Sequence, residues 1–300
     1  MLTKKTTLRK VIMSLTLVLG IVLLLACNSN STNSKELSPE EQQKLDKVKG
    51  EDSAEGTEDR KSSKELTSLT ITANGVSFEM IRVEVGTFTM GATSEQENPK
   101  DDEYPTHSVT LTKNYYLGKT EVTQALWEAV MGGNPSHYKG DNRPVEKVSW
   151  NDCQTFIKKL NVATGKNFRL PTEAEWEFAA RGGNKSENYQ YSGSNNLSEV
   201  AWWGDNSGDQ THEVATKQPN ELDLYDMSGN VWEWCQDWYG DYSSSAQTNP
   251  TGPNTGSYRV RRGGSFFDDV GSFRSSRRWY YDPSGRGNSC IGLRLALEDM

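Results

Sequence analysis

The sequence is poor in the side chains from which most zinc, iron and redox centres are built. It contains four cysteines and three histidines among 300 residues. His107, His137 and His212 are far apart in the chain and show none of the spacings that metal ligands adopt, which argues against a zinc or iron site. We expect His107 and His137 in loops or on the surface.

Basic charge is also scarce. The 33 Lys and Arg residues are outnumbered by 41 Asp and Glu residues, and the formal net charge is −8. Because nucleic acids attract proteins mainly through their phosphate charges, a chain of this balance argues against a nucleic-acid partner.

No apolar run is long enough to span a bilayer as a helix. The most apolar stretch, from Val11 to Ala26, has 16 residues, whereas about 20 are needed. It follows four basic residues and ends in Leu-Leu-Ala-Cys at Cys27, which resembles a bacterial lipobox. We predict that residues 1–26 are a lipoprotein signal peptide and that a lipid on Cys27 anchors the chain to a membrane. An ordinary signal peptide with a chance cysteine is the alternative.

The residue after Cys27 gives an indication of where the anchored protein is located in the cell. Asn28 stands there instead of the aspartate that signals retention in the inner membrane. The sequence therefore favours the cell envelope, with the outer membrane or the cell surface as the expected location.

The remaining three cysteines allow at most one disulfide. Cys153 falls inside a predicted helix, where we expect a buried thiol. Cys235 and Cys290 could pair, and the sequence alone does not decide whether they do.

Residues 27–70 are rich in Asn, Ser, Lys and Glu and contain no aromatic side chain. Such a segment cannot bury enough apolar surface to offset the entropy lost on ordering. We interpret it as a flexible polar tether and expect one folded domain over residues 71–300.

Within that domain the pattern predicts a mixed fold. Residues 78–90 alternate and break at Gly86, as a hairpin would, and two further extended runs cover 107–112 and 115–117. Capping residues and glycines delimit helices over 122–131, 149–160 and 172–181. Beyond Arg181 the chain is rich in Gly, Asn, Ser and Trp, which predicts loops and short strands in an α+β fold.

Five stretches, taken in order, are specific to one family. They are Val85–Gly91, Pro144–Asp152, Arg169–Gly183, Asp226–Trp234, and Arg261–Phe266 closing with Gly292–Leu295. Their order and spacing resemble the formylglycine-generating enzyme (sulfatase-modifying factor) family across residues 76–297. The resemblance implies an α+β fold that is a variant of the C-type lectin-like fold, with few helices and many ordered loops.

The resemblance also bears on activity. Enzymes of this family oxidise a substrate cysteine with oxygen and a copper ion held by two cysteines. The matching positions here are Asp268 and Phe273, and neither side chain is the soft thiolate that Cu(I) requires. The resemblance therefore implies no bound copper and no formylglycine formation, and we expect a protein that is not an enzyme.

A calcium site of the family falls on the loop Asp226–Glu233. Carried over residue by residue, Asp226 and Glu233 supply carboxylates, and Gly229 and Val231 supply backbone carbonyls. Such hard oxygen ligands suit Ca²⁺. The alternative is that Asp226 and Glu233 only organise the loop by accepting backbone N–H bonds.

The C-terminal stretch 257–295 reverses the charge of the rest of the chain, with eight Arg, no Lys and three acids. We expect Arg274, Arg278 and Arg294 in buried salt bridges. The other polar and aromatic residues predict a recognition surface, because interfaces favour Arg and aromatic side chains. The predicted ligand-binding residues are Phe267, Asp268, Asp269, Gly271, Ser272, Arg277, Trp279, Tyr280, Tyr281, Asp282, Gly287 and Asn288.

This stretch is similar to the variable region of proteins diversified by retroelements, among which treponeme variable lipoproteins use the same domain. That likeness implies that related copies differ almost only between residues 266 and 290. We therefore predict a membrane-anchored surface lipoprotein that binds a protein or glycan ligand through this stretch. The alternatives are an enzyme of this superfamily with other chemistry, and a structural lipoprotein of an envelope secretion or motility machine.

Overall fold

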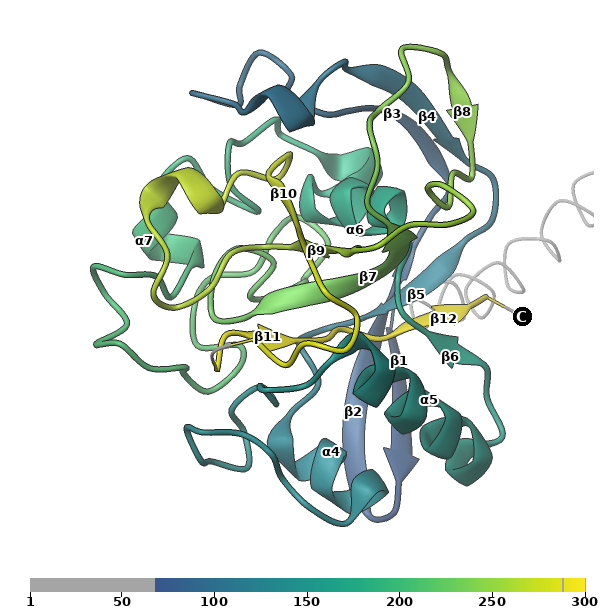
Figure 1. The fold of residues 1–300 in the computed structure, drawn as a ribbon, viewed down its shortest axis with the longest axis vertical. Coiled ribbons are helices and arrows are strands. Elements are labelled where there is room, and N and C mark those ends of the chain that lie inside the picture. Colours follow the sequence, from purple (N-terminus) through teal and green to yellow (C-terminus); the bar gives the residue numbers. More distant parts are fainter. Residues whose placement is uncertain (1–67, 288, 300) are drawn as a thin grey trace, which may run out of the picture. The chain divides into compact units, whose positions relative to one another are not determined.

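The computed structural model describes residues 68–287 and 289–299 (Figure 1). The predicted signal peptide, the lipidation site Cys27, most of the tether and the predicted ligand residue Asn288 lie outside this range. Within it, no helix has both the length and the apolar character needed to cross a membrane.

The first sheet joins the beginning and the end of the described chain. Its strand order is β1-β2-β5-β12-β6, and all its strand pairs are antiparallel. The strands are β1 (Ser68–Ala73), β2 (Val76–Val83), β5 (Tyr115–Gly118), β12 (Ala296–Glu298) and β6 (Phe168–Arg169).

The second sheet carries most of the C-terminal stretch. Its order is β10-β9-β7-β11, so β10 is an edge strand. The strands are β10 (Arg278–Tyr281), β9 (Arg259–Arg262), β7 (Trp232–Trp238) and β11 (Ile291–Gly292). A third sheet contains β3 (Gly86–Met90), β4 (His107–Leu111) and β8 (Gln247–Thr248).

The predicted helices are confirmed, together with their caps. The helices are α4 (Gln124–Met131), α5 (Trp150–Thr164) and α6 (Glu173–Ala180). Figure 1 shows α4 and α5 beside β1 and β2, at the opposite end of the view from β3, β4 and β8. The remaining helical turns are short: α7 (Leu197–Val200), η1 (Asp101–Glu103), η2 (Gly183–Lys185) and η3 (Val270–Ser272).

The side-chain hydrogen bonds at the helix starts explain why sequence located them well. The hydroxyls of Ser149 and Thr172 accept the N–H of the third helical residue, and the carboxylates of Asp152 and Glu175 bond back to the cap. At the other ends of α4 and α5, Gly132 and Gly165 adopt the left-handed conformation that glycine tolerates.

The hairpin predicted over residues 78–90 is wrong. Both strands form, but β2 pairs with β1 and β5, whereas β3 pairs with β4 in another sheet. A side chain at Gly86 would collide with the Asn184 amide and begin 2.6 Å from the Phe178 ring. The glycine thus lets the chain pass close to α6 as it crosses between sheets.

The structure shows the state of Cys153 and Cys235. Cys153 and Cys235 are free and fully buried, so the disulfide between Cys235 and Cys290 that the sequence left open is not formed. The expectation of a buried thiol at Cys153 is confirmed. Burial raises the pKa of the Cys153 and Cys235 thiols well above the ordinary value.

Candidate functional site

The second sheet rests on α6 through buried ion pairs. Glu173, the first residue of α6, accepts Arg278 Nη2 at 2.7 Å and lies 3.1 Å from Arg262 Nε. Glu177, one turn further along, pairs with Arg262. Each of these four side chains is at most 5% exposed. The carboxylates of α6 therefore hold β9 and β10 in place from the inner side.

Other buried arginines are paired in the same way. Arg274 binds Glu103, and Arg294 donates to Glu233 at 2.7 Å. The predicted burial of Arg274, Arg278 and Arg294 in salt bridges is confirmed. Since burying a charge without a partner is strongly unfavourable, each pair fixes the position of the segment that carries it.

The predicted ligand-binding residues differ in how far they reach solvent. Asp268, Ser272 and Gly287 are half-buried. The exposed ones are Phe267, Asp269, Gly271, Trp279, Tyr280, Tyr281 and Asp282.

Arg277, expected at the surface, is instead buried with an exposed fraction of 4%. Its Nη1 atom lies 3.1 Å from Asp102, and its guanidinium lies 4.4 Å from the Trp279 ring centroid. The buried Arg277 guanidinium therefore packs against the exposed Trp279 ring.

The exposed rings of β10 touch one another and their neighbours. The Tyr280 ring centroid lies 4.4 Å from that of Tyr239 and 5.0 Å from that of Tyr258. Trp279 and Tyr280 have nearly parallel rings 6.2 Å apart. We call Tyr258, Trp279, Tyr280 and Tyr281 the aromatic surface.

The two positions that hold copper ligands in the enzymes have structural roles here. One Asp268 oxygen accepts the Trp232 Nε1–H at 2.8 Å and the Ser265 N–H at 3.0 Å. Phe273 is fully buried, and its ring lies 2.5 Å from where a side chain at Gly264 would begin. These two side chains contribute no thiolate to a copper site.

The residues of the predicted calcium loop are only partly available to an ion. Both Glu233 oxygens already accept the Arg294 guanidinium, and one also accepts the Trp176 Nε1–H at 2.7 Å. One Asp226 oxygen accepts the Ala215 N–H at 2.7 Å. Asp226 thus organises the loop as the alternative interpretation expected, whereas Glu233 binds side chains.

A further buried acid lies near Asp226, and sequence analysis did not single it out. Both oxygens of Glu121 and the second oxygen of Asp226 are buried. None of the three accepts a hydrogen bond from an N–H or hydroxyl donor among the described residues. Burial, with the neighbouring carboxylates, raises the pKa of Glu121 well above its usual range and that of Asp226 to about 6. Within the described part of the chain, no three His, Cys, Asp or Glu side chains converge as a metal site.

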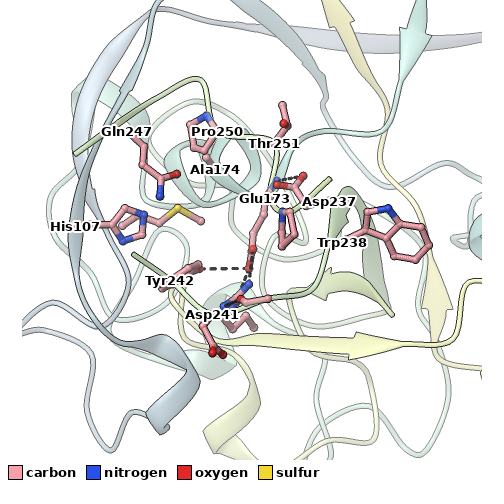
Figure 2. A pocket seen from close by; sticks show the side chains of 15 residues that line it. His107, Glu173, Ala174, Asp237, Trp238, Asp241, Tyr242, Gln247, Pro250 and Thr251 are labelled. Atoms are coloured by element: carbon pink, nitrogen blue, oxygen red, sulfur yellow. Dashed lines mark hydrogen bonds and ion pairs between the residues drawn. The ribbon is translucent and has the colours of Figure 1, made fainter. Parts of the chain in front are cut away.

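A pocket of about 260 Å³ lies beside the start of α6. Figure 2 shows His107, Gln247 and Tyr242 at one side of the Glu173 carboxylate and Asp237 at the other. Asp237 accepts the Glu173 N–H at 2.9 Å, and burial next to that acid raises the pKa of Asp237 to about 8. The expectation that His107 lies in a loop or on the surface is wrong, because it is buried in β4 with its ring against Tyr242.

Sequence analysis missed this pocket because its lining comes from five separate parts of the chain, Met90 included. His107, Glu173, the segment 237–253 and Arg278 meet only in the fold. No motif in the sequence marks them as neighbours.

Known proteins of one family resemble this chain in sequence. The family model of the sulfatase-modifying factor enzyme 1-like domain matches residues 70–299. The chain is 35% identical over 270 residues to the chaperone protein LppX of Paenibacillus barcinonensis, covering 73% of this chain and 89% of that protein. It is 39% identical over 164 residues to the formylglycine-generating enzyme of Thermomonospora curvata, covering 48% of this chain and 52% of the enzyme.

A solved structure extends the likeness to the fold. Treponema denticola variable protein 1 is similar with a TM-score of 0.69 and 35% identity, over 77% of this chain and 99% of that one. The predicted α+β, C-type lectin-like fold is therefore confirmed. The chain belongs to the sulfatase-modifying factor (formylglycine-generating enzyme) domain family.

Proposed function

We propose that this protein is a lipid-anchored envelope protein that binds a ligand through the aromatic surface on β10. The observation that carries the proposal is the distribution of exposed apolar side chains. Of nine large hydrophobic side chains exposed in the described residues, six lie between residues 258 and 281. Exposed clusters of this kind mark interaction sites.

The support beneath the aromatic surface favours recognition. Tyr280 of the aromatic surface packs on Tyr239, and the Tyr239 ring centroid lies 4.6 Å from the guanidinium of Arg278, whose charge is paired with Glu173. Rings held in this way lose little entropy when a ligand binds, which raises affinity. Trp, Tyr and Arg are also the residues that contribute most to binding at protein interfaces.

Two features favour binding over formylglycine chemistry. The copper positions hold Asp268 and Phe273, and both are engaged in the fold. The relative that matches over 89% of its own length, the protein LppX of Paenibacillus barcinonensis, is named as a chaperone. Variation among related copies confined to residues 266–290 would agree with the same proposal.

We propose calcium as the ion of the Asp226 loop, held by a set of ligands that differs from the family pattern. The neighbouring carboxyl groups of Asp226 and Glu121, which share a hydrogen bond, become oxygen donors of the kind that Ca²⁺ prefers when they release their protons. Backbone carbonyls of Gly229 and Val231 would complete the ligands. Glu233 would stay with Arg294.

Replacing Trp279 and Tyr280 together by Ala should abolish ligand capture. The double variant removes the centre of the aromatic surface while Arg278 and its ion pair remain. Capture from envelope extracts and culture medium, quantified by mass spectrometry against the unmodified full chain, should fall at least about tenfold. Val162→Ala, which alters a side chain 83% exposed on α5, is the matched control and should capture as before. A stoichiometric envelope complex that survives the double substitution would instead favour the structural-machine alternative.

Replacing Cys27 by Ala should release the protein from membranes. Acyl chains on this cysteine would supply the anchoring free energy, at about 0.8 kcal/mol per buried methylene. Detergent phase partitioning and metabolic labelling with a fatty acid measure the effect, and Ser31→Ala, four residues further along the predicted tether, is the control. A Cys27→Ala variant that stays labelled and membrane-bound would contradict the lipid anchor.

Purified protein incubated with Cu(I) should bind no stoichiometric copper and convert no Cys-Thr-Pro-Ser-Arg peptide to its aldehyde. The Asp268→Cys, Phe273→Cys double variant restores two thiolates and should bind Cu(I) more tightly than the natural chain. Elemental analysis and peptide mass spectrometry give the readouts. Copper-dependent aldehyde formation by the natural chain would show that the protein is an enzyme after all.

Adding Ca²⁺ should raise the melting temperature of the metal-free protein. At a free concentration of about 100 times Kd, the stabilisation is about 2.7 kcal/mol. The shift should vanish in Glu121→Gln and Asp226→Asn variants and persist in Glu79→Gln, whose carboxylate lies at the surface. Differential scanning calorimetry with and without a chelator measures it, and an unchanged shift in both buried variants would remove this site.

A further inference from the structure

The eight arginines between residues 257 and 295 fall into two groups. Six of them have a carboxylate within 4.0 Å: Arg262, Arg274, Arg277, Arg278, Arg286 and Arg294. Arg259 and Arg261, both on β9, have no such partner among the described residues. In a chain with eight more acids than bases, two neighbouring arginines without acidic partners call for an explanation.

Arg259 is held between two indole rings. Its guanidinium carbon lies 3.9 Å from the Trp150 ring centroid and 3.5 Å from that of Trp238. One of its five N–H donors binds the Gln236 carbonyl at 2.5 Å, while its Nε has no partner among the described residues. Stacking fixes the plane of the guanidinium, and because Nε is buried a ligand would have to reach the Nη edge.

The acid whose charge bears on Arg259 does not neutralise it. That acid is Asp237, and burial raises its pKa to about 8, so it is protonated at neutral pH. Among the described residues, the positive charge of Arg259 is surrounded by two indole rings and the Gln236 carbonyl, with no carboxylate within 4.0 Å.

Arg261 has a similar setting. Its guanidinium lies 4.7 Å from the Trp232 ring centroid and 5.4 Å from that of Tyr281, next to the Cys290 thiol. Its Nε also has no hydrogen-bond partner among the described residues. Asp268, the acid on this side, is engaged by Trp232 and Ser265.

The two arginines share a face of the sheet with exposed rings of the aromatic surface. In the antiparallel pair of β9 and β10, Arg261 stands opposite Trp279, and Arg259 stands opposite Tyr281. Residues opposite each other in such a pair project to the same side. Half-buried guanidinium groups thus lie next to rings that are 42% and 38% exposed.

The outer edge of β10 adds backbone groups. No hydrogen bond from another element of the described chain reaches residues 279–281 on the side away from β9. An edge strand of this kind can pair with an extended peptide, whose alternate side chains then meet the residues on either face. Arg259 is stacked on Trp238 of β7, so a segment paired along this edge would lie on the other side of β9 from the Arg259 guanidinium.

We propose that Arg259 and Arg261, with Trp279 and Tyr281, bind an acidic, extended segment of a partner protein. Carboxylates of the partner accept the in-plane donors of the two guanidinium groups, a geometry that arginine favours. Because Arg259 is directed over β7, the segment lies across this face of the sheet. This inference rests on the proposed function and specifies the chemistry of the ligand.

A labelled peptide in which glutamate and threonine alternate is a direct probe. We expect the full chain in detergent to bind it with an affinity that falls as salt is raised, and not to bind the matching glutamine–threonine peptide. The Arg259→Gln, Arg261→Gln double variant should lose at least about tenfold in affinity. Arg286→Gln, which removes one exposed arginine already paired with Asp152, is the control for loss of an arginine charge elsewhere and should stay within about twofold.

A second variant separates binding from folding. The Arg259→Lys, Arg261→Lys pair keeps both charges but loses the planar fork, and we expect an affinity between those of the natural chain and the Gln variant. Far-ultraviolet circular dichroism and a cooperative thermal transition should identify the folded variants, because the substitutions alter the surroundings of Trp150, Trp232 and Trp238 themselves.

Several outcomes would overturn the proposal. They are equal binding of the acidic and neutral peptides, unchanged affinity in a folded Gln variant, and binding of hyaluronate without binding of the acidic peptide. A ligand whose capture depends on Trp279 and Tyr280 but not on the two arginines would leave the proposed function standing and remove the acidic specificity. Capture that does not depend on the aromatic surface at all would remove the proposed function.

Discussion

The pairing of α6 carboxylates with arginines of the C-terminal strands is the constraint on which the candidate site depends. Glu173 and Glu177 are buried at the start and the middle of α6, and they are matched by Arg262 of β9 and Arg278 of β10. A buried carboxylate that loses its arginine costs several kcal/mol, so alternative placements of either strand are strongly disfavoured. Because side chains alternate along a strand, fixing Arg262 on the inner face places Arg261 on the other.

One short sequence combines a rigid base with a recognition surface. Along residues 277–281, two buried arginines are followed by three exposed aromatic side chains. Arg277 and Arg278 direct their charges to Asp102 and Glu173, and their guanidinium groups lie against aromatic rings. The surface rings can therefore change in identity without disturbing the ion pairs beneath them. A scaffold built in this way tolerates variation at its surface, which is the property that a recognition protein requires.

Sequence analysis predicted local structure and the family well, and it predicted long-range placement less well. Helix starts were found because the cap residues, such as Ser149 with Asp152, lie within one turn of each other. Motif order led to the fold because those motifs are long and specific. The error at residues 78–90 arose because strand pairing depends on distant partners: nothing near Gly86 shows that β3 will pair with β4. Arg277 was misplaced for the same reason, since its partner Asp102 lies 175 residues away.

The two positions at which the family resemblance places copper-binding cysteines carry side chains that hold the local backbone. Asp268 accepts hydrogen bonds from Trp232 and Ser265, and the buried Phe273 ring packs against Gly264. The loop 266–277 is thereby ordered by the protein's own side chains, so the strand that follows it, β10, can present its aromatic rings without any metal at those two positions.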